Sequence, residues 1–402
     1  MSASNLTPPA ESLVCRRRRT TVLTALPATI TAMPREDGPT VCQHRIIDLF
    51  AGPGGLDVGA TWLGIPVTGI ELDEGACATR AAAGLDTVQG DVRAYGPSDF
   101  PDATVLTGGP PCQTFTVAGK GTGRRVIDQI TDRIAAMVDH PEAHPARGWS
   151  TDERTELILE PMRWALLALK TNVPFETIVL EQVPAVLPVW VAFRDALEKH
   201  DYNCAVGVLR SEEFGVPQTR RRAILIARRG KDKVDLPVPT HDAFRKGSSN
   251  QGTIGREPWV SMDRALRRKS SFTVISNYGS GGNPRNRGQR HSGEPAATVT
   301  GKVTRNRLRL ATGEWSRLSH CEAGMLQTFP HDFPWSGSDI GQQIGNAIPP
   351  RLAVHVLAQT LQIPLCRKEL DRVVRVSWEE GRRSPLRPPS RDTEQTMAMA
   401  SE

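Results

Sequence analysis

Residues 44–55 read His-Arg-Ile-Ile-Asp-Leu-Phe-Ala-Gly-Pro-Gly-Gly, an apolar run followed by a glycine-rich turn. Such a run predicts a buried strand, and the turn predicts the start of a helix. Similar apolar runs recur, with helical stretches at 74–83 and 189–199 between them. Continuous apolar strands alternating with helices are typical of a mostly parallel sheet covered on both faces. We therefore predict an α/β fold whose strands include residues 44–50, 66–71, 103–107, 177–181, 204–209 and 223–227.

The composition is that of a weakly basic globular protein. Hydrophobic residues make up 39% and charged residues 23% of the 402 positions, which excludes a wholly disordered chain, a coiled coil and a collagen. No run of 18 or more apolar residues is present, so we expect no membrane association. A formal net charge of +6 favours a polyanionic partner. The seven cysteines form no CxxC and no cluster with histidine, which indicates reduced thiols and no metal site.

The pattern along the chain predicts five segments. Residues 1–43 resemble a disordered basic tail; an export signal after Arg16–Arg19 is disfavoured because threonine and proline interrupt the apolar stretch, and a true start at Met33 is an alternative. The main α/β domain covers residues 44–229. After it the strand–helix alternation stops, and Gly, Asn, Ser and Arg predict a smaller irregular domain. The predicted boundaries are 230–315 for that domain, 316–365 for a return to the main domain, and 366–402 for a C-terminal tail.

The glycine-rich turn predicts a site for a nucleoside-type cofactor. Glycines allow the backbone to approach a ligand closely, and a helix N-terminus offers free N–H groups. A dinucleotide fingerprint would have a third glycine where Asp57 stands, so an NAD-dependent oxidoreductase is disfavoured. Glu71 ends the second strand and could accept hydrogen bonds from ribose hydroxyls. Asp91, near the end of the third strand, could accept one from an adenine amino group. Two acids without a phosphate clamp suit S-adenosylmethionine.

Three further elements carry the candidate chemistry. Gly108-Gly109-Pro110-Pro111-Cys112-Gln113 follows a strand, so two prolines shape the loop that presents the Cys112 thiol. A thiolate is a strong nucleophile when its pKa is lowered. Glu181 ends an apolar strand, where a carboxylate is costly unless it is paired, solvated or used. In Gln218-Thr219-Arg220-Arg221-Arg222, alternation places Arg220 and Arg222 on one face and Arg221 on the other. A buried thiol, a structural salt bridge and a solvated basic edge are the respective alternatives.

This ordered series resembles the DNA (cytosine-carbon-5) methyltransferase family. Asp48–Gly55 is similar to its first motif, 109–113 to its catalytic loop, Glu181 to the acid of its Glu-Asn-Val motif, and Gln218, Arg220 and Arg222 to its Gln-x-Arg-x-Arg motif. Residues 321–330 and 343–350 resemble the two last motifs. The order is the usual one, so we expect no circular permutation. The resemblance implies a Rossmann-like, class I methyltransferase fold, with residues that bind S-adenosylmethionine at Phe50, Gly52, Gly54, Gly55, Glu71, Asp91 and Asn346.

The resemblance implies methylation of carbon 5 of a cytosine that is flipped out of double-stranded DNA, because the base cannot be reached inside the stack. Cys112 would attack carbon 6, Glu181 would bond the ring nitrogen and the amine, and Arg222, with Arg220, would contact the base. No metal is required. We expect a monomer in the cytoplasm, associated with the nucleoid, that acts alone or beside a separate restriction endonuclease.

Residues 230–315 would then be the target-recognition domain. Its arginines can bind phosphates or read guanine edges, and residues 294–300 resemble the Thr-Leu element of such domains. A solvated charge run is the alternative for any one arginine. The predicted recognition residues are Arg285, Arg287, Thr298, Arg305 and Arg307.

Two departures from the family pattern stand out. Gln182 replaces the usual asparagine after Glu181, which affects the bonds expected to hold the catalytic loop, and residues 123–150 form an unusually long stretch after that loop. Two other functions remain open at this point: an RNA (tRNA) cytosine methyltransferase, although its Cys-Phe-Thr signature is absent, and a non-catalytic DNA-binding relative.

Overall fold

The computed structural model describes residues 44–111, 122–139, 148, 150, 152–268, 270–277 and 288–386. Cys112 and the rest of its loop lie outside these ranges, as do the predicted N-terminal tail and the recognition residues Arg285 and Arg287. The helix over 122–139 falls within the long stretch noted above, and side chains are described for its residues 126–138.

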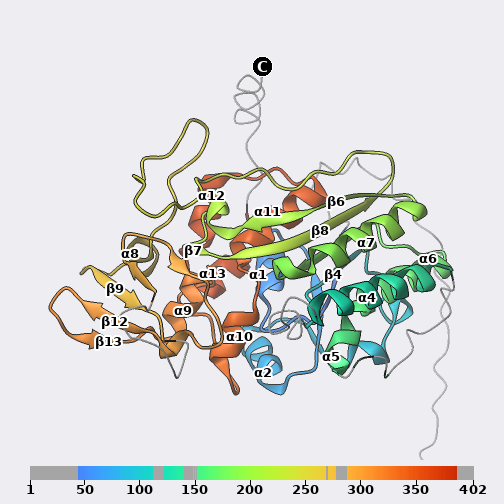
Figure 1. The fold of residues 1–402 in the computed structure, drawn as a ribbon, viewed down its shortest axis with the longest axis horizontal. Helices are drawn as coiled ribbons and strands as arrows, with labels where there is room; N and C mark the ends of the chain where they lie inside the picture. Colours follow the sequence, from blue (N-terminus) through green and yellow to red (C-terminus); the bar gives the residue numbers. More distant parts are fainter. Residues whose placement is uncertain are drawn as a thin grey trace, which may run out of the picture. The chain divides into compact units, whose positions relative to one another are not determined.

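A seven-stranded sheet forms the centre of the described chain (Figure 1). Six of the strands run in the same direction, and β8, which lies between β5 and β6, is reversed and pairs antiparallel with both. The predicted α/β fold with a mostly parallel sheet is therefore confirmed. In spatial order the strands are β3 (Thr87–Gln89), β2 (Val67–Glu71), β1 (Ile46–Leu49), β4 (Val105–Gly108), β5 (Thr177–Gln182), β8 (Arg221–Arg229) and β6 (Tyr202–Arg210).

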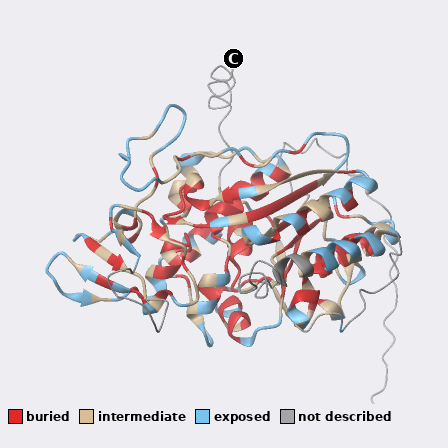
Figure 2. Ribbon diagram, in the orientation of Figure 1, coloured by how far each residue is buried: buried red, intermediate tan, exposed pale blue. Residues whose placement is uncertain are grey.

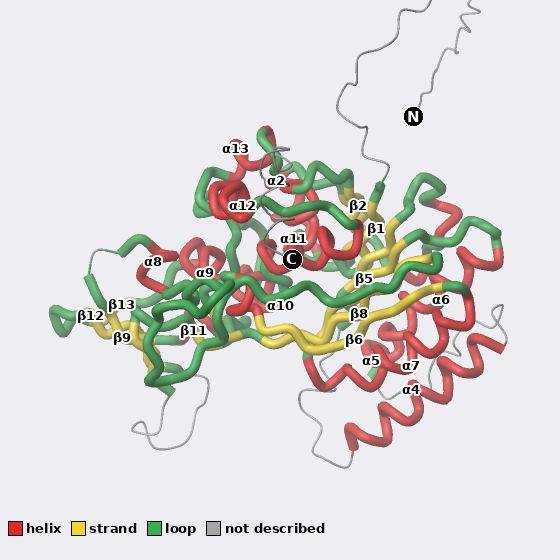
Figure 3. The backbone as a smooth tube through the Cα atoms, turned by 90° about the horizontal axis from the view of Figure 1, so that it is seen from above, coloured by secondary structure: helices red, strands yellow, loops and turns green. Residues whose placement is uncertain are grey.

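Both faces of this sheet are buried beneath helices, which explains why its strands are continuously apolar. Successive residues of β8 alternate between the two cores, with Leu225 in one and Ile224 and Ile226 in the other. Figures 2 and 3 show the buried sheet between its two helical layers. One layer holds α4 (Thr122–Asp139), α6 (Glu160–Lys170) and α7 (Leu187–Leu197), with the short α5 (Glu153–Glu156) before it; the other holds α1 (Gly55–Trp62) and α11 (Pro350–Leu361).

The long stretch after the catalytic loop therefore contributes to the core. Ile130, Ile134 and Met137 of α4 are buried in the same cluster as Trp190 and Phe193 of α7. Three apolar residues at this spacing form one face of a helix, so α4 supplies part of the layer that covers the sheet.

A second, antiparallel sheet lies within the region predicted to be the smaller domain. Its strands, in spatial order, are β10 (Gln289–His291), β9 (Phe272–Ile275), β12 (Arg307–Leu310) and β13 (Trp315–Ser316). Its core includes Phe272, Val274 and Leu308, and it also takes in residues of α8 (Met262–Leu266), α9 (His320–Leu326) and α10 (Ile340–Asn346). This region is thus less irregular than expected.

A short parallel pair joins that region to the main sheet. Strand β7 (Gln218–Thr219) directly precedes β8, and it pairs with β11 (Ala296–Ala297). The predicted Thr-Leu-like element therefore lies beside the Gln-x-Arg-x-Arg motif in the fold.

The prediction of a tail from residue 366 is wrong for residues 367–383. They form α12 (Arg367–Val373) and α13 (Trp378–Arg383), whose Leu370, Val373 and Trp378 pack in one core with Trp62 of α1. The Trp378 indole N–H also donates to the Ala83 carbonyl of α2 (Glu74–Ala83), at 2.9 Å. The many arginines nearby made this stretch resemble a solvated tail, although its Leu370, Val373 and Trp378 are buried.

Candidate active site

The main cavity opens where the strand order reverses, at the carboxyl ends of β1 and β4. This is the expected ligand position in an open α/β sheet. The cavity measures about 1350 Å³. Its walls bring together predicted cofactor and catalytic residues that are as far apart in sequence as Phe50 and Asn346. The predicted residues that line it are Phe50, Gly52, Gly55, Glu71, Asp91, Glu181, Arg220, Arg222, Thr298 and Asn346.

The β1–α1 turn has a backbone that depends on its glycines. Gly54 has φ +97°, and a Cβ there would lie 2.3 Å from the Leu85 side chain. A Cβ on Gly55 would lie 2.2 Å from the Ile348 carbonyl oxygen, so glycine at this position allows the helix to approach the backbone of the 343–350 motif closely. Gly52 differs, because nothing lies within 4 Å of its Cβ position and it faces the open cavity. Gly54 does not line the cavity and serves the turn itself.

A fully buried ion pair lies beneath this turn. The Arg80 guanidinium donates to both carboxylate oxygens of Asp57, at 2.6 and 3.0 Å. Burial opposes the charge on Arg80, yet Asp57 raises the pKa of Arg80 above its usual value. Asp57 stands where a dinucleotide fingerprint would have glycine, so that departure now has a structural reason.

Glu71 is held at the end of β2 by backbone N–H groups. Its Oε2 accepts from Gly52 at 2.7 Å, and its Oε1 accepts from Leu72 and Asp73 at 2.8 and 2.7 Å. These bonds orient the carboxylate at the cavity wall, where its remaining lone pairs can accept from a ligand hydroxyl.

Asp91 and Asn346 line the cavity with partners of their own. Both oxygens of Asp91 accept from the Arg93 guanidinium, with the shortest distance 2.6 Å, and Asp91 raises the pKa of Arg93. Asn346 accepts from the Gln342 amide at 2.7 Å. Their predicted roles toward the cofactor therefore remain predictions.

Asp48 is a further cavity residue, which the sequence reading included only within the first motif. Its carboxyl group is buried and accepts from the Thr107 hydroxyl at 2.6 Å. Burial, with Asp57 nearby, raises the pKa of Asp48 well above its usual value. Asp48 therefore places a buried carboxyl group, held by the Thr107 hydroxyl, at the cavity wall.

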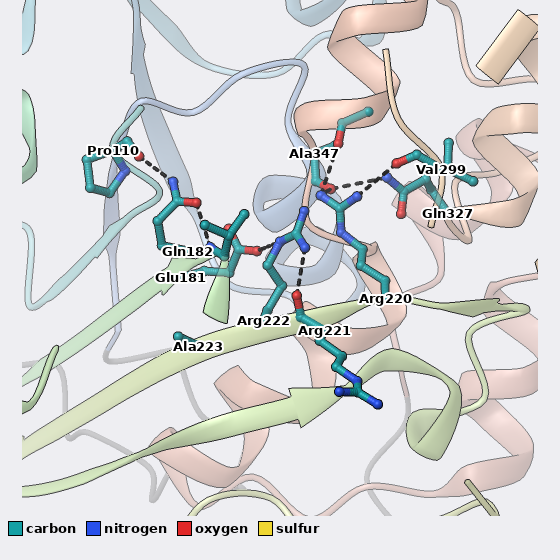
Figure 4. Close-up of polar contacts among 12 residues, drawn as sticks. Pro110, Glu181, Gln182, Arg220, Arg221, Arg222, Ala223, Val299, Gln327 and Ala347 are labelled. Carbon is teal, nitrogen blue, oxygen red and sulfur yellow. Dashed lines mark hydrogen bonds and ion pairs between the residues drawn. The ribbon is translucent and has the colours of Figure 1, made fainter. Parts of the chain in front are cut away.

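Glu181 and Arg222 meet at one wall of the cavity (Figure 4). The Arg222 Nε lies 2.5 Å from the Glu181 Oε1, and each side chain is only 12% exposed. Arg221 points away from this pair, as the predicted alternation requires. The ion pair thus places a carboxylate and a guanidinium together at the end of β5, facing the same space as Glu71.

Gln182 connects the end of β5 to the loop that leads to Cys112. Its amide Nε2 donates to the Pro110 carbonyl at 2.5 Å, and its Oε1 accepts from the Val183 N–H at 2.6 Å. Gly108, Gly109 and Pro111 line the cavity. The glutamine in place of asparagine therefore still holds the start of this loop.

Arg220 lines the same cavity, but most of its donors are engaged by the backbone. Its fully buried guanidinium donates to the carbonyls of Val299, Gly345 and Ala347, at 3.0–3.1 Å. Burial, and Arg222 nearby, lower the pKa of Arg220 well below its usual value. We expected Arg220 to act beside Arg222 on the base; its contacts instead join three segments of the chain.

Gln218 and Gln327 extend this junction. The Gln218 amide donates to the Gln327 Oε1 at 2.6 Å, and its own oxygen accepts from the Val299 N–H at 2.9 Å. Gln327 donates in turn to the Ile344 carbonyl at 2.7 Å. The sequence reading matched these glutamines to motifs, but it gave no sign that they bond to each other.

Of the predicted recognition residues, only Thr298 among those described lines the main cavity. Its hydroxyl donates to the Thr219 carbonyl at 2.8 Å. Arg305 and Arg307 are exposed and lie away from the cavity, and the Arg307 guanidinium stacks on Trp315 with 4.3 Å to the ring centroid. Arg285 and Arg287 lie outside the described residues.

A family model described as C-5 cytosine-specific DNA methylase matches residues 44–138 and 177–362. The chain belongs to the C-5 cytosine-specific DNA methylase family. It is thus a DNA cytosine-5 methyltransferase that uses S-adenosylmethionine as methyl donor, as the resemblance implied.

Two relatives of this methylase come from bacteria. It is 26% identical over 357 residues to the Type II methyltransferase M1.HphI of Haemophilus parahaemolyticus, an alignment covering 79% of this chain and 86% of that protein. It is 26% identical over 359 residues to the Type II methyltransferase M.NgoFVII of Neisseria gonorrhoeae, covering 80% and 87%.

Solved structures share the fold of the methylase. The S. pombe Dnmt2 methyltransferase matches with a TM-score of 0.54 and 17% identity, covering 79% of this chain and 98% of that one. The Entamoeba histolytica methyltransferase EhMeth matches with a TM-score of 0.52 and 12% identity, covering 80% and 98%.

The described residues were compared with the requirements of a metal site and of a membrane span. Among them, no group of three or more His, Cys, Asp and Glu side chains is placed to hold a metal ion. None of the helices in that part of the chain has the length and apolar character needed to cross a bilayer.

Proposed function

We propose that this methylase modifies cytosine within a specific sequence of double-stranded DNA, with Cys112 as nucleophile and Glu181 and Arg222 as the groups that hold the base. The observation that carries this proposal is the shared cavity, in which Glu181 and Arg222 face the same space as Glu71 and the glycine turn. A base and a methyl donor must meet in one enclosed space, and these residues line such a space.

The residues present fit S-adenosylmethionine. Gly52 has open space at its Cβ position, and the Glu71 carboxylate is already oriented by three backbone donors. Phe50, Glu71 and Asp91 would hold the adenosine part, and Asn346 would close the site from α10. When bound, S-adenosylmethionine supplies the methyl group that carbon 5 of the base receives.

The other steps of the proposed reaction are carried out by residues of the chain. The Cys112 thiolate forms a bond to carbon 6 of the flipped cytosine, which places negative charge on the ring. One Glu181 oxygen accepts a hydrogen bond from the exocyclic amine, and the other, when it carries a proton, donates to the ring nitrogen. Arg222 fixes the Glu181 side chain and contacts the base. After methylation, a water molecule takes the proton from carbon 5, the electron pair of that C–H bond restores the double bond to carbon 6, and the carbon–sulfur electron pair returns to sulfur. The thiolate is thereby regenerated and 5-methylcytosine leaves.

Cys112 follows a segment whose position is set by neighbours. Gln182 holds the Pro110 carbonyl, and Pro111 borders the cavity. The described chain thus reaches the cavity one residue before Cys112 in sequence, and the assignment of Cys112 as nucleophile rests on its match to the catalytic-loop motif.

The bacterial relatives, named Type II methyltransferases, support a role in restriction and modification. We propose that the chain acts as a monomer at the chromosome and protects DNA from a separate endonuclease. Thr298, with Arg285, Arg287, Arg305 and Arg307, is proposed to contribute to target recognition.

Duplex DNA containing 5-fluorocytosine tests the mechanism, because fluorine cannot leave carbon 5 as a cation. The full chain should form a covalent protein–DNA adduct that survives denaturing electrophoresis and requires S-adenosylmethionine, and a Cys112→Ser variant should form none. Bisulfite sequencing of DNA from a host that expresses the chain gives the target. A Cys112→Ser protein that still methylated DNA would rule out the proposed nucleophile.

A further inference from the structure

A second, strongly basic cleft lies beside the active-site cavity. It measures about 540 Å³ and is lined by five cations, Arg210, Arg221, Arg222, Lys246 and Arg290, against a single acid, Glu212. Arg222 and Thr298 line both hollows, so the cleft shares a wall with the site of the Glu181–Arg222 pair. The proposed methyl transfer does not use the other four cations.

Two of these cations lie directly opposite each other on neighbouring strands. Arg210 of β6 and Arg221 of β8 are direct partners in the antiparallel register. Like charges directly opposite on neighbouring strands destabilise a sheet. Within the described chain, no carboxylate lies within 4.0 Å of the basic nitrogens of Arg210, Arg221, Lys246 or Arg290 in an ion pair. An anion bound between them would relieve this repulsion.

Arg290 is fixed in the cleft rather than extended into solvent. Its guanidinium stacks on the Phe244 ring, 4.5 Å from the centroid, and Phe244 packs edge-on against the buried Trp259. The Arg290 Nη1 is buried and has no hydrogen-bond partner among the described residues. Stacking leaves the edge of a guanidinium free to donate, which is the geometry that recognises phosphate.

Glu212 is the one acid of the cleft. It is 4% exposed, and burial raises the pKa of its carboxyl, although Arg210 and Arg221 act in the opposite direction. Five cations thus face one acid. The cleft also spans both parts of the molecule: Arg210 and Arg221 come from the main sheet, and Arg290 comes from β10 of the antiparallel sheet.

We infer that this cleft binds the phosphodiester backbone of the DNA next to the flipped cytosine. The inference rests on the proposed function, because it places the DNA strand across the wall that the two hollows share. Contacts of arginine and lysine with phosphates set the register of a protein on DNA without reading its sequence. The cleft would thus fix the strand while the active site holds the base.

The salt dependence of DNA binding tests this inference. A triple variant, Arg221→Gln, Lys246→Gln and Arg290→Gln, is compared with a matched control, Lys170→Gln, Lys199→Gln and Lys231→Gln. The control removes the same charge from exposed residues near the opposite end of strands β5, β8 and β6. Binding of a fluorescein-labelled duplex of about 30 base pairs is followed by anisotropy from roughly 0.05 to 0.3 M salt.

Each lost phosphate contact should reduce the slope of log K against log salt by about 0.9, so the cleft triple should lose about 2–3 and the control triple less than about 1. With the duplex saturating at low salt, kcat of the cleft triple should stay within about twofold of wild type while KM for DNA rises. Unchanged calorimetric binding of S-adenosylmethionine shows that each variant is folded.

Equal slopes for the two triples would overturn the inference. So would tight binding of inorganic phosphate that the cleft triple abolishes while duplex binding is unchanged, because the cleft would then serve a small anion. A wild-type chain that binds the duplex but transfers no methyl group would instead refute the proposed function, and the slopes would still report on the cleft.

Discussion

The carboxylate of Glu181 and the guanidinium of Arg222 lie on neighbouring antiparallel strands and form an ion pair, with Oε1 and Nε 2.5 Å apart. Arg222 also lines the basic cleft, so this one residue connects the place proposed for the base with the place proposed for the DNA backbone. A substitution at either partner should therefore disturb chemistry more than cofactor binding.

Glu181→Gln keeps the shape of the side chain but removes its charge. We expect kcat to fall roughly 10²–10⁴-fold, as for other groups that assist proton transfer, with S-adenosylmethionine affinity within about twofold of wild type. Single-turnover methylation and calorimetry measure the two quantities. Glu176→Gln, at an exposed acid just before β5, is the control. Wild-type kcat in Glu181→Gln would exclude an essential carboxylate.

Gln182→Ala should loosen the loop that carries Cys112. Loss of the hydrogen bond to the Pro110 carbonyl removes about 1 kcal/mol of positioning, so kcat should fall about 5–10-fold while KM for S-adenosylmethionine stays unchanged. Steady-state kinetics with both substrates separates the two effects. Gln129→Ala on the exposed face of α4 should leave both constants unchanged. An equal loss in both variants would argue against a positioning role.

Arg80→Met should strongly destabilise the fold. The substitution leaves Asp57 buried without its partner, which costs about 3–5 kcal/mol. Adding Asp57→Leu removes the stranded charge and should recover part of the loss. Urea unfolding followed by tryptophan fluorescence gives the free energies of unfolding. Arg382→Met breaks an exposed pair with Glu379 and should cost less than about 1 kcal/mol.

His355 should make the protein less stable as the pH falls. Burial and the nearby Arg351 lower the pKa of His355 to about 3, and burial lowers that of His241 to about 4. The unfolded chain has a pKa near about 6.5 at both positions and takes up protons first. Between about pH 6.5 and 4 the free energy of unfolding should thus fall with pH, by up to about 1.4 kcal/mol per pH unit for each histidine.

A His355→Gln variant should show a shallower dependence over this range, measured by urea unfolding at about pH 7, 6 and 5. His331→Gln, at an exposed position, should follow the wild-type curve. If His355→Gln also keeps the wild-type slope, the buried imidazole does not contribute to the acid sensitivity.

The sequence alone was sufficient for the fold class, and it singled out several residues that the fold brings to one cavity. Buried strands such as β5 and β8 are apolar on both faces, and short runs of this kind between helices are typical of a sheet covered on both sides. Glu71 and Glu181 could be singled out because an acid at the end of such a strand needs a reason. Apolar runs and acids at strand ends are local signals, and each can be recognised from a few consecutive residues.

Signals that depend on distant partners could not be read in this way. Alternation along the strand places Arg220 and Arg222 on the same face and does not distinguish them. The Arg220 guanidinium nevertheless donates to the carbonyls of Val299, Gly345 and Ala347. Trp378 lies in an arginine-rich stretch that gives no local sign of a buried helix, and its burial depends on a distant partner, Trp62. The backbone carbonyls that accept from an arginine carry no trace in the sequence, because every residue has one.

The pairing of β7 with β11 bears on attempts to redesign target choice. Residues 296–299 belong to the predicted recognition region, but Gln218, Thr219 and Arg220 bond to them directly. Replacing residues 296–299 together with the recognition region would remove contacts that the catalytic domain needs. An exchanged segment that ends before Ala296 would keep the β7–β11 pair, so that target specificity could be changed without altering the catalytic domain.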